Sequence, residues 1–86
     1  MMFNFLEKKK INKQFDEIIQ RIEMNVSNNY KDAAQLNLKE LEAMFAEYET
    51  AGRLDEKQIV RYSGVIDSLK GRMKNFTHKD QKPTWV

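Results

Sequence analysis

The 86-residue sequence contains no cysteine, only one proline and only three glycines. The absence of cysteine excludes disulfides and thiolate metal sites, and it fits a reducing, intracellular setting. The scarcity of glycine and proline, together with 33% charged residues, favours helices over sheets or disorder. No apolar run approaches the roughly 20 residues that a membrane-spanning helix requires. We therefore expect one soluble, cytoplasmic helical domain.

The chain also has little net charge, a formal +2 at pH 7. A balance this close gives no argument for a nucleic-acid or membrane partner. The lysines near the N-terminus follow the apolar residues Phe3, Phe5 and Leu6, whereas a secretory signal has its basic residues first. A chain of this length has a small core, so we expect a protein partner, with a second copy as one candidate.

The clearest structural signal is the stretch TAGRLDEKQI in the middle of the chain. Gly52 stands where a helix end needs a left-handed residue. Asp55 and Gln58 have the spacing of a capping box, in which each side chain bonds the backbone amide of the other residue. Leu54 and Ile59 flank this cap at the positions of a hydrophobic staple. The stretch predicts a tight corner between two helices.

Three amphipathic helices are predicted, at about residues 5–27, 30–51 and 56–75, because apolar residues recur there at spacings of three and four. The fold class that follows is all-α, a three-helix bundle built on a long antiparallel helical hairpin of the second and third helices. The first helix packs along this hairpin. In the structural alternative, dimerisation completes the bundle and two hairpins share one core. The three apolar stripes are Ile11, Phe15, Ile18, Ile22 and Val26, then Ala34, Leu38, Leu41, Phe45 and Tyr48, then Ile59, Tyr62, Ile66, Leu69, Met73 and Phe76.

Several local features can be predicted inside this frame. Asn29 is predicted to cap the N-terminus of the second helix, with Asp32 in its first turn. Tyr48 and Tyr62 are predicted near the bundle edge, where their hydroxyls reach water. Gly64 is predicted to allow a close helix approach. Residues 28–51 hold two basic and five acidic residues and residues 52–86 eight basic and four acidic, so an acidic helix is expected beside a basic one.

The two ends of the chain carry apolar residues outside these stripes. Residues 1–76 are predicted to form a single domain, and 77–86 a polar, flexible tail. Phe3, Phe5 and Leu6 are expected either to cover one end of the bundle or to meet a partner. The same two possibilities apply to Trp85 in the tail.

The string IEMNVS at residues 22–27, with the Asn-rich turn and helical hairpin that follow it, resembles the YvfG-type group of small uncharacterised bacterial proteins. The resemblance implies a bacterial helical hairpin that can associate as a dimer. It implies no enzymatic activity. This chain differs from that group by its longer N-terminal segment and its Trp-containing tail.

A search for catalytic, cofactor and metal motifs finds none. His78 is the only histidine and has no other ligand type at metal-binding spacing. Asp32, Glu40, Glu47 and Glu49 fall outside the apolar stripe and lack the Glu-x-x-His pairs of bundle metal sites. No phosphate-binding loop or nucleophile elbow is present. We expect a non-enzyme with no cofactor, metal or small-molecule substrate.

Two basic clusters stand out, one in the first turns of the first helix and one at four-residue spacing along the third. Clustered cations supply non-specific nucleic-acid affinity, although a run of charge is most often a solvated face. We predict a non-enzymatic helical protein–protein interaction module, with a small nucleic-acid-associated regulatory protein as the alternative. The candidate contact residues are Arg53, Lys57, Arg61, Lys8, Lys9, Lys10 and Trp85.

Overall fold

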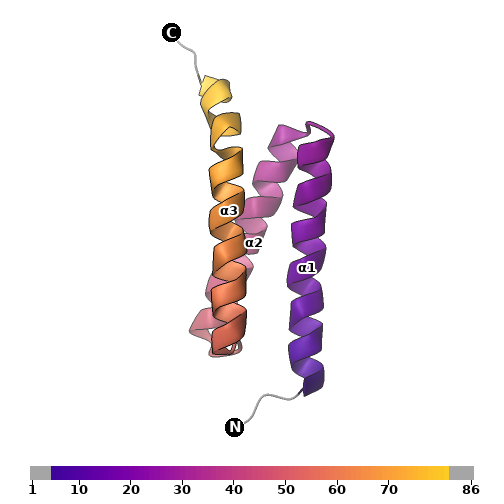
Figure 1. The fold of residues 1–86 in the computed structure, drawn as a ribbon, viewed down its shortest axis with the longest axis vertical. Helices are drawn as coiled ribbons and strands as arrows, with labels where there is room; N and C mark the ends of the chain where they lie inside the picture. Colours follow the sequence, from indigo (N-terminus) through magenta and orange to yellow (C-terminus); the bar gives the residue numbers. More distant parts are fainter. Residues whose placement is uncertain (1–4, 82–86) are drawn as a thin grey trace.

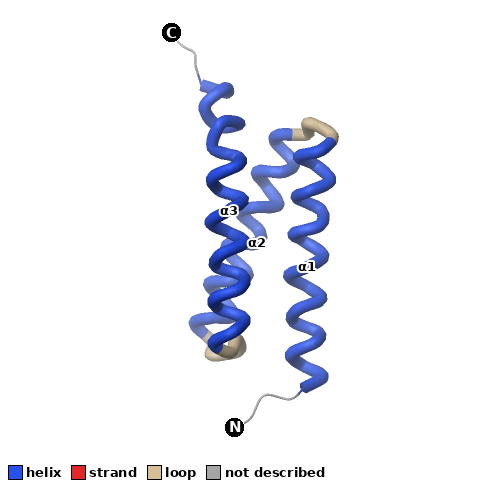
Figure 2. Tube along the Cα trace, viewed as in Figure 1, coloured by secondary structure: helices blue, strands red, loops and turns tan. Residues whose placement is uncertain are grey.

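The computed structural model describes residues 5–81, with side chains to residue 74. This part of the chain forms the helices α1 (Phe5–Ser27), α2 (Lys31–Thr50) and α3 (Glu56–Gln81), joined by two short corners. The helices run up, down and up, so that α1 and α3 point the same way and α2 runs against both (Figure 1, Figure 2). The predicted all-α three-helix bundle is confirmed.

The helix α2 is tilted across the other two, lying near α1 at one end of the molecule and near α3 at the other (Figure 1). Its backbone approaches α1 along more of its length than it approaches α3. The backbones of α1 and α3 approach each other at few points, and side chains such as Phe15 and Tyr62 meet between them. The α1–α2 hairpin is therefore the more closely packed of the two.

Phe15 lies at the centre of the core and is fully buried. Its ring stacks on Tyr62 of α3 with centroids 4.5 Å apart, and it meets Tyr48 and Phe45 of α2 edge-on at 5.8 and 6.4 Å. Fully burying a side chain of this kind contributes about 1.5–3 kcal/mol, and this cluster joins all three helices. The buried apolar residues are Ile11, Phe15, Ile22, Ala34, Leu38, Leu41, Leu54, Tyr62, Ile66, Leu69 and Met73.

The α2–α3 corner has the predicted left-handed glycine. Gly52 has a φ of 72°, its amide bonds the Glu49 carbonyl at 3.0 Å, and the Arg53 amide bonds the Tyr48 carbonyl at 2.9 Å. This pair of bonds is the Schellman motif, which satisfies the last carbonyls of a helix.

The predicted capping box follows at the start of α3. The Gln58 amide donates to Asp55 Oδ1 at 2.8 Å, and the Asp55 amide donates to Gln58 Oε1 at 2.9 Å. Leu54, just before the cap, is buried in the core, and Ile59 packs against the core on the other side. The corner is therefore fixed by backbone bonds, a reciprocal cap and an apolar anchor.

The predicted role of Asn29 is wrong. Asn29 has a φ of 65° and ends α1: its amide bonds the Val26 carbonyl at 3.0 Å, and the Tyr30 amide bonds the Asn25 carbonyl at 2.8 Å. Tyr30 takes the N-cap position of α2 and makes no side-chain cap bond. Asparagine tolerates the left-handed region, so it serves here as the terminator of one helix and not as the cap of the next.

Other differences from the sequence-based expectations concern single positions. A Cβ at Gly64 would meet no atom within 4 Å, so this glycine does not mark a close helix approach. Phe5 and Leu6 are 70% and 71% exposed and do not cover the end of the bundle. The helix α3 continues past residue 75 to Gln81, so the first part of the segment expected as a tail is helical. Phe3 and Trp85 lie outside the described residues.

Candidate interaction surfaces

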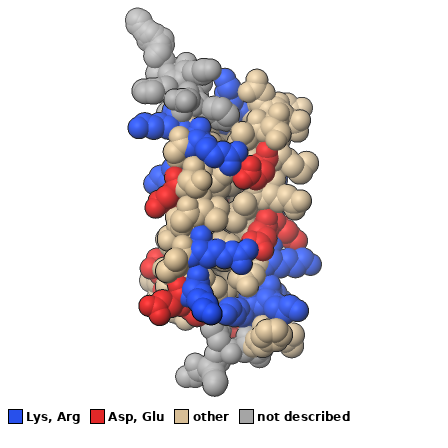
Figure 3. Space-filling view, in the orientation of Figure 1, with Lys and Arg blue, Asp and Glu red and all other residues tan. Residues whose placement is uncertain are grey.

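The two predicted basic clusters meet at the end of the bundle where α1 and α3 begin, and Lys and Arg side chains gather there (Figure 3). Lys8 Nζ lies 2.7 Å from Asp55 Oδ2, and Arg53 Nη2 lies 2.7 Å from Glu7 Oε2. The bond from Glu7 raises the pKa of Arg53. The pKa of Asp55 is lowered by Lys8 and, to a smaller extent, by the Gln58 amide. Two ion pairs therefore join the start of α1 to the segment that leads into α3.

Both arginines of the second cluster are engaged within the molecule. The Arg53 guanidinium lies 4.7 Å from the centroid of the Tyr48 ring. Arg61 Nη2 lies 3.6 Å from Asp16 Oδ1, and the Arg61 guanidinium lies 5.0 Å from the centroid of the Tyr62 ring. Each arginine therefore has a carboxylate partner and an aromatic ring beside it, while about half of each side chain stays exposed.

The remaining candidates are lysines on the outer surface. Lys9, Lys10 and Lys57 are exposed, and none of them forms an ion pair within the part of the chain that the structure describes. Lys9 Nζ lies 5.4 Å from the centroid of the exposed Phe5 ring, a cation–π arrangement within one helix. The last candidate, Trp85, lies outside the described residues.

A partly buried polar network that the sequence pattern does not predict joins α1 to α3. Tyr62 is fully buried, not at the edge, and its hydroxyl donates to Asp16 Oδ1 at 3.0 Å with Asn12 Oδ1 at 3.3 Å. Gln58, only 3% exposed, donates through Nε2 to Asn12 Oδ1 at 2.9 Å. Burial, followed by the Asp16 contact, raises the pKa of Tyr62 to about 12. Because every member has a partner, the network fixes how α1 lies against α3.

The expected attraction between an acidic α2 and a basic α3 is small. One ion pair among the described residues joins these helices, Lys70 Nζ to Glu42 Oε2 at 3.3 Å. The other cations of α3 in ion pairs reach α1 instead, including Arg72, which donates to both oxygens of Glu23 at 3.0 and 3.1 Å. That bidentate contact lowers the pKa of Glu23.

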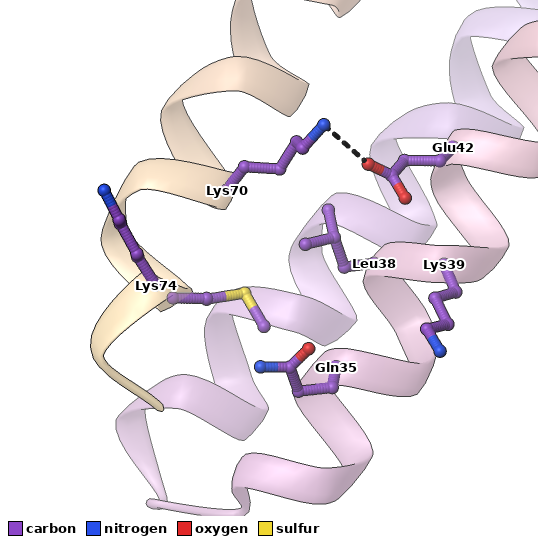
Figure 4. A pocket seen from close by; sticks show the side chains of 7 residues that line it. Gln35, Leu38, Lys39, Glu42, Lys70 and Lys74 are labelled. Carbon is purple, nitrogen blue, oxygen red and sulfur yellow. Dashed lines mark ion pairs between the residues drawn. The ribbon is translucent and has the colours of Figure 1, made fainter. Parts of the chain in front are cut away.

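A groove of about 370 Å³ lies between α2 and α3, in the half of the molecule towards the α1–α2 corner (Figure 4). Its lining includes Leu38 and Met73, which also belong to the core. Lys70 reaches across to Glu42 at one side, while Lys39 and Lys74 extend away from the groove (Figure 4). We call this the α2–α3 groove; its lining is Gln35, Leu38, Lys39, Glu42, Lys70, Met73 and Lys74.

The sequence pattern missed this groove, because neither periodicity nor composition reports the tilt of α2. A partial signal exists. Lys39 directly follows Leu38 and Lys74 directly follows Met73, so each lysine borders an apolar stripe of its helix. The two apolar stripes face each other across the groove, so its floor is apolar and lysines stand along its edges. We call these lysines the cationic rim.

The described residues contain no group of three His, Cys, Asp or Glu side chains close enough to hold a metal ion. In the same part of the chain every buried side-chain nitrogen and oxygen has a hydrogen-bond partner. None of the described helices is long and apolar enough to cross a bilayer. A comparison with protein families, curated proteins and solved structures finds no significant match to this chain.

Proposed function

We propose that this protein is a small non-enzymatic module that binds another protein through its helical surface. The α2–α3 groove is the observation that supports this proposal, because Leu38 and Met73 extend the core into its lining. A partner that inserts an apolar side chain there continues the core of the bundle. Lys39 and Lys74 border the groove, so the partner that fits best is an amphipathic helix with acidic residues beside its apolar face.

Large apolar side chains are also exposed on all three helices. They are Phe5, Leu6 and Met24 of α1, Leu36 of α2 and Val60 of α3, with Tyr30 at the first corner, and each is more than half exposed. Single exposed apolar residues are normal on a soluble protein. On a chain with so small a core, however, this many support a role in association.

A second copy of the chain is the first partner to test. The surface of α2 outside the bundle carries Leu36 with the acidic residues Glu40 and Glu47, which is the chemistry that the cationic rim accepts. Light scattering on the purified chain is expected to show a dimer at high micromolar concentration. A strict monomer under those conditions would remove the homodimer and leave a different protein as the partner.

Site-specific photo-crosslinking in the native cell tests the groove itself. A photoreactive residue at Gln35, whose side chain points into the groove (Figure 4), is expected to give a discrete crosslinked species, whereas the same residue at the exposed Glu17 of α1 serves as the matched control. Crosslinks of equal yield and pattern from both positions would contradict a contact at the groove.

A nucleic-acid-associated regulator is the alternative, supported by the exposed Lys9, Lys10 and Lys57, which form no ion pairs with described residues. Against it, the acidic residues in 7–17 and 47–61 equal the basic ones in number, so this end has no excess positive charge. Binding to duplex and single-stranded DNA and RNA at low and moderate salt decides the question. Lack of binding even at low salt would contradict the nucleic-acid alternative.

A further inference from the structure

The first turns of α1 combine exposed apolar and cationic side chains on one face. Phe5 is 70% exposed and Leu6 is 71% exposed. Lys9, Lys10 and Lys13 follow at spacings that place them on the same outward side of the helix, and all three are exposed. We call this set the α1 tip.

Ion pairing separates the charges of this segment into two groups. Glu7 and Lys8 face the bundle and are paired with Arg53 and Asp55 at 2.7 Å each. The three lysines of the α1 tip have no carboxylate partner among the described residues. The outward face of the α1 tip therefore carries a local excess of positive charge that the small net charge of the whole chain conceals.

The geometry of the α1 tip suits the boundary between lipid headgroups and acyl chains. The tip lies at the extreme end of the bundle, where α1 begins (Figure 1). From Leu6 to Lys13 the helix rises by roughly 10 Å, comparable with the depth to which interfacial helices enter a bilayer. Phe5 and Leu6 lie nearer the end of α1 than the three lysines do. When this end of the helix enters a bilayer first, the apolar side chains lie deeper than the lysines.

We propose that the α1 tip is a contact site for an anionic lipid surface. Phe5 and Leu6 enter the acyl boundary, and the three lysines reach the anionic headgroups. The inference goes beyond the proposed protein-binding role. It also departs from the sequence-based expectation of no membrane partner, which rested on the small net charge and on the lack of an apolar run long enough to span a bilayer.

A lipid surface fits these residues better than a nucleic acid does. Phosphate binding uses cations alone and gains nothing from an exposed leucine at the end of a helix. Lipid binding uses both the cations and the apolar side chains. An aromatic ring such as Phe5 can also stack on a nucleic-acid base, whereas the aliphatic side chain of Leu6 cannot, so the two partners respond differently when Leu6 is replaced.

Vesicle co-sedimentation of the full chain tests the proposal, with phosphatidylcholine vesicles compared with phosphatidylcholine–phosphatidylglycerol vesicles. We expect half-binding at roughly millimolar accessible anionic lipid, and weaker binding at physiological than at low salt. Phe5→Ser and Leu6→Ser are each expected to weaken binding about tenfold, and Lys10→Gln about fivefold. The matched controls are Val60→Ser on α3 and Lys31→Gln at the start of α2, both expected to leave binding unchanged.

Three outcomes overturn the proposal. The first is no binding to anionic vesicles at low salt. The second is binding that the two control substitutions weaken as much as Phe5→Ser and Lys10→Gln do. The third is binding that Lys10→Gln weakens and Leu6→Ser does not, accompanied by equal affinity for single-stranded DNA, since this pattern describes a general polyanion surface. Circular dichroism of each variant confirms that the helices remain intact.

Discussion

The two corners of the bundle end a helix in the same way and begin the next helix differently. Asn29 and Gly52 both adopt a positive φ, 65° and 72°. At each corner the amide of this residue and the amide of the next residue bond carbonyls in the last turn of the helix, which is the Schellman pattern. After Gly52, a reciprocal cap between Asp55 and Gln58 starts α3. After Asn29, α2 starts at Tyr30 without a side-chain cap. The comparison shows that the end of one helix and the start of the next are determined by different residues.

The difference between the corners extends to the ends of the molecule on which they lie. At the α2–α3 corner, the Lys8–Asp55 and Arg53–Glu7 ion pairs tie the corner to α1. At the opposite end the corner lacks a cap, and the α2–α3 groove lies in that half of the bundle. One end is therefore held by a cap and two ion pairs, while the α2–α3 groove, the surface proposed for a partner, lies towards the other end.

Among substitutions at the two corners, Gly52→Val is expected to change the free energy of unfolding most. A Cβ at this position meets no atom within 4 Å, so the cost comes from the left-handed φ and not from a clash. A β-branched residue there is expected to reduce the free energy of unfolding by about 2 kcal/mol. Urea denaturation measures the loss, with Gly52→Asn as the control that tolerates this φ. Unchanged stability in the valine variant would count against the left-handed cap.

Removal of the cap is expected to distinguish the two helix starts. Asp55→Ala loses the acceptor for the Gln58 amide and is expected to cost about 1 kcal/mol. Tyr30→Ala at the N-cap of α2 removes an exposed side chain that makes no cap bond, so the expected change is below about 0.3 kcal/mol. Equal losses in the two variants, measured as shifts of the urea midpoint, would show that the cap adds nothing.

The charge of Asp55 adds a pH-dependent contribution. The lowered pKa of this carboxyl in the folded protein means that its ionised form stabilises the fold above the unfolded value near 3.8. The stabilisation is lost as the pH falls through the lower folded value. Asp55→Asn keeps a cap acceptor, so its stability deficit, about 0.5 kcal/mol near neutral pH, is expected to vanish in acid. A deficit that does not change between neutral and acidic pH would assign it to the cap geometry instead.

The smallest effect is expected from Asn29→Gly. Glycine relieves the cost of the positive φ but increases the entropy of the unfolded chain, so a net gain of a few tenths of a kcal/mol is expected. Thermal denaturation is expected to show a rise of a degree or two. A lower melting temperature would indicate that the Asn29 side chain contributes a stabilising contact.

Much of the fold can be predicted from short stretches of sequence, because local signals determine it. Gly52, Asp55 and Gln58 lie within seven residues of one another and each has a separate role, so the α2–α3 corner is read correctly. Asn29 is suited to either end of a helix, so the first corner is ambiguous. The start of α2 could not be assigned from residue type alone.

The partly buried network and the groove depend on contacts between distant segments. Tyr62 and Asp16 are far apart in the sequence, and nothing in the spacing of polar residues predicts that they meet. The α2–α3 groove depends on the tilt of α2. The meeting of the two basic clusters could have been predicted, since an up–down–up bundle places the starts of the first and third helices at one end.

Native-state hydrogen exchange provides the most direct test of the difference between the corners. The amides of Ala33 and Gln58 occupy the same third position of α2 and α3, but only Gln58 has a side-chain acceptor, Asp55 Oδ1 at 2.8 Å. We expect the Gln58 amide to be protected at least about fivefold more than the Ala33 amide, which corresponds to the roughly 1 kcal/mol of a cap. Equal protection of the two amides would contradict the conclusion that the two corners start their helices differently.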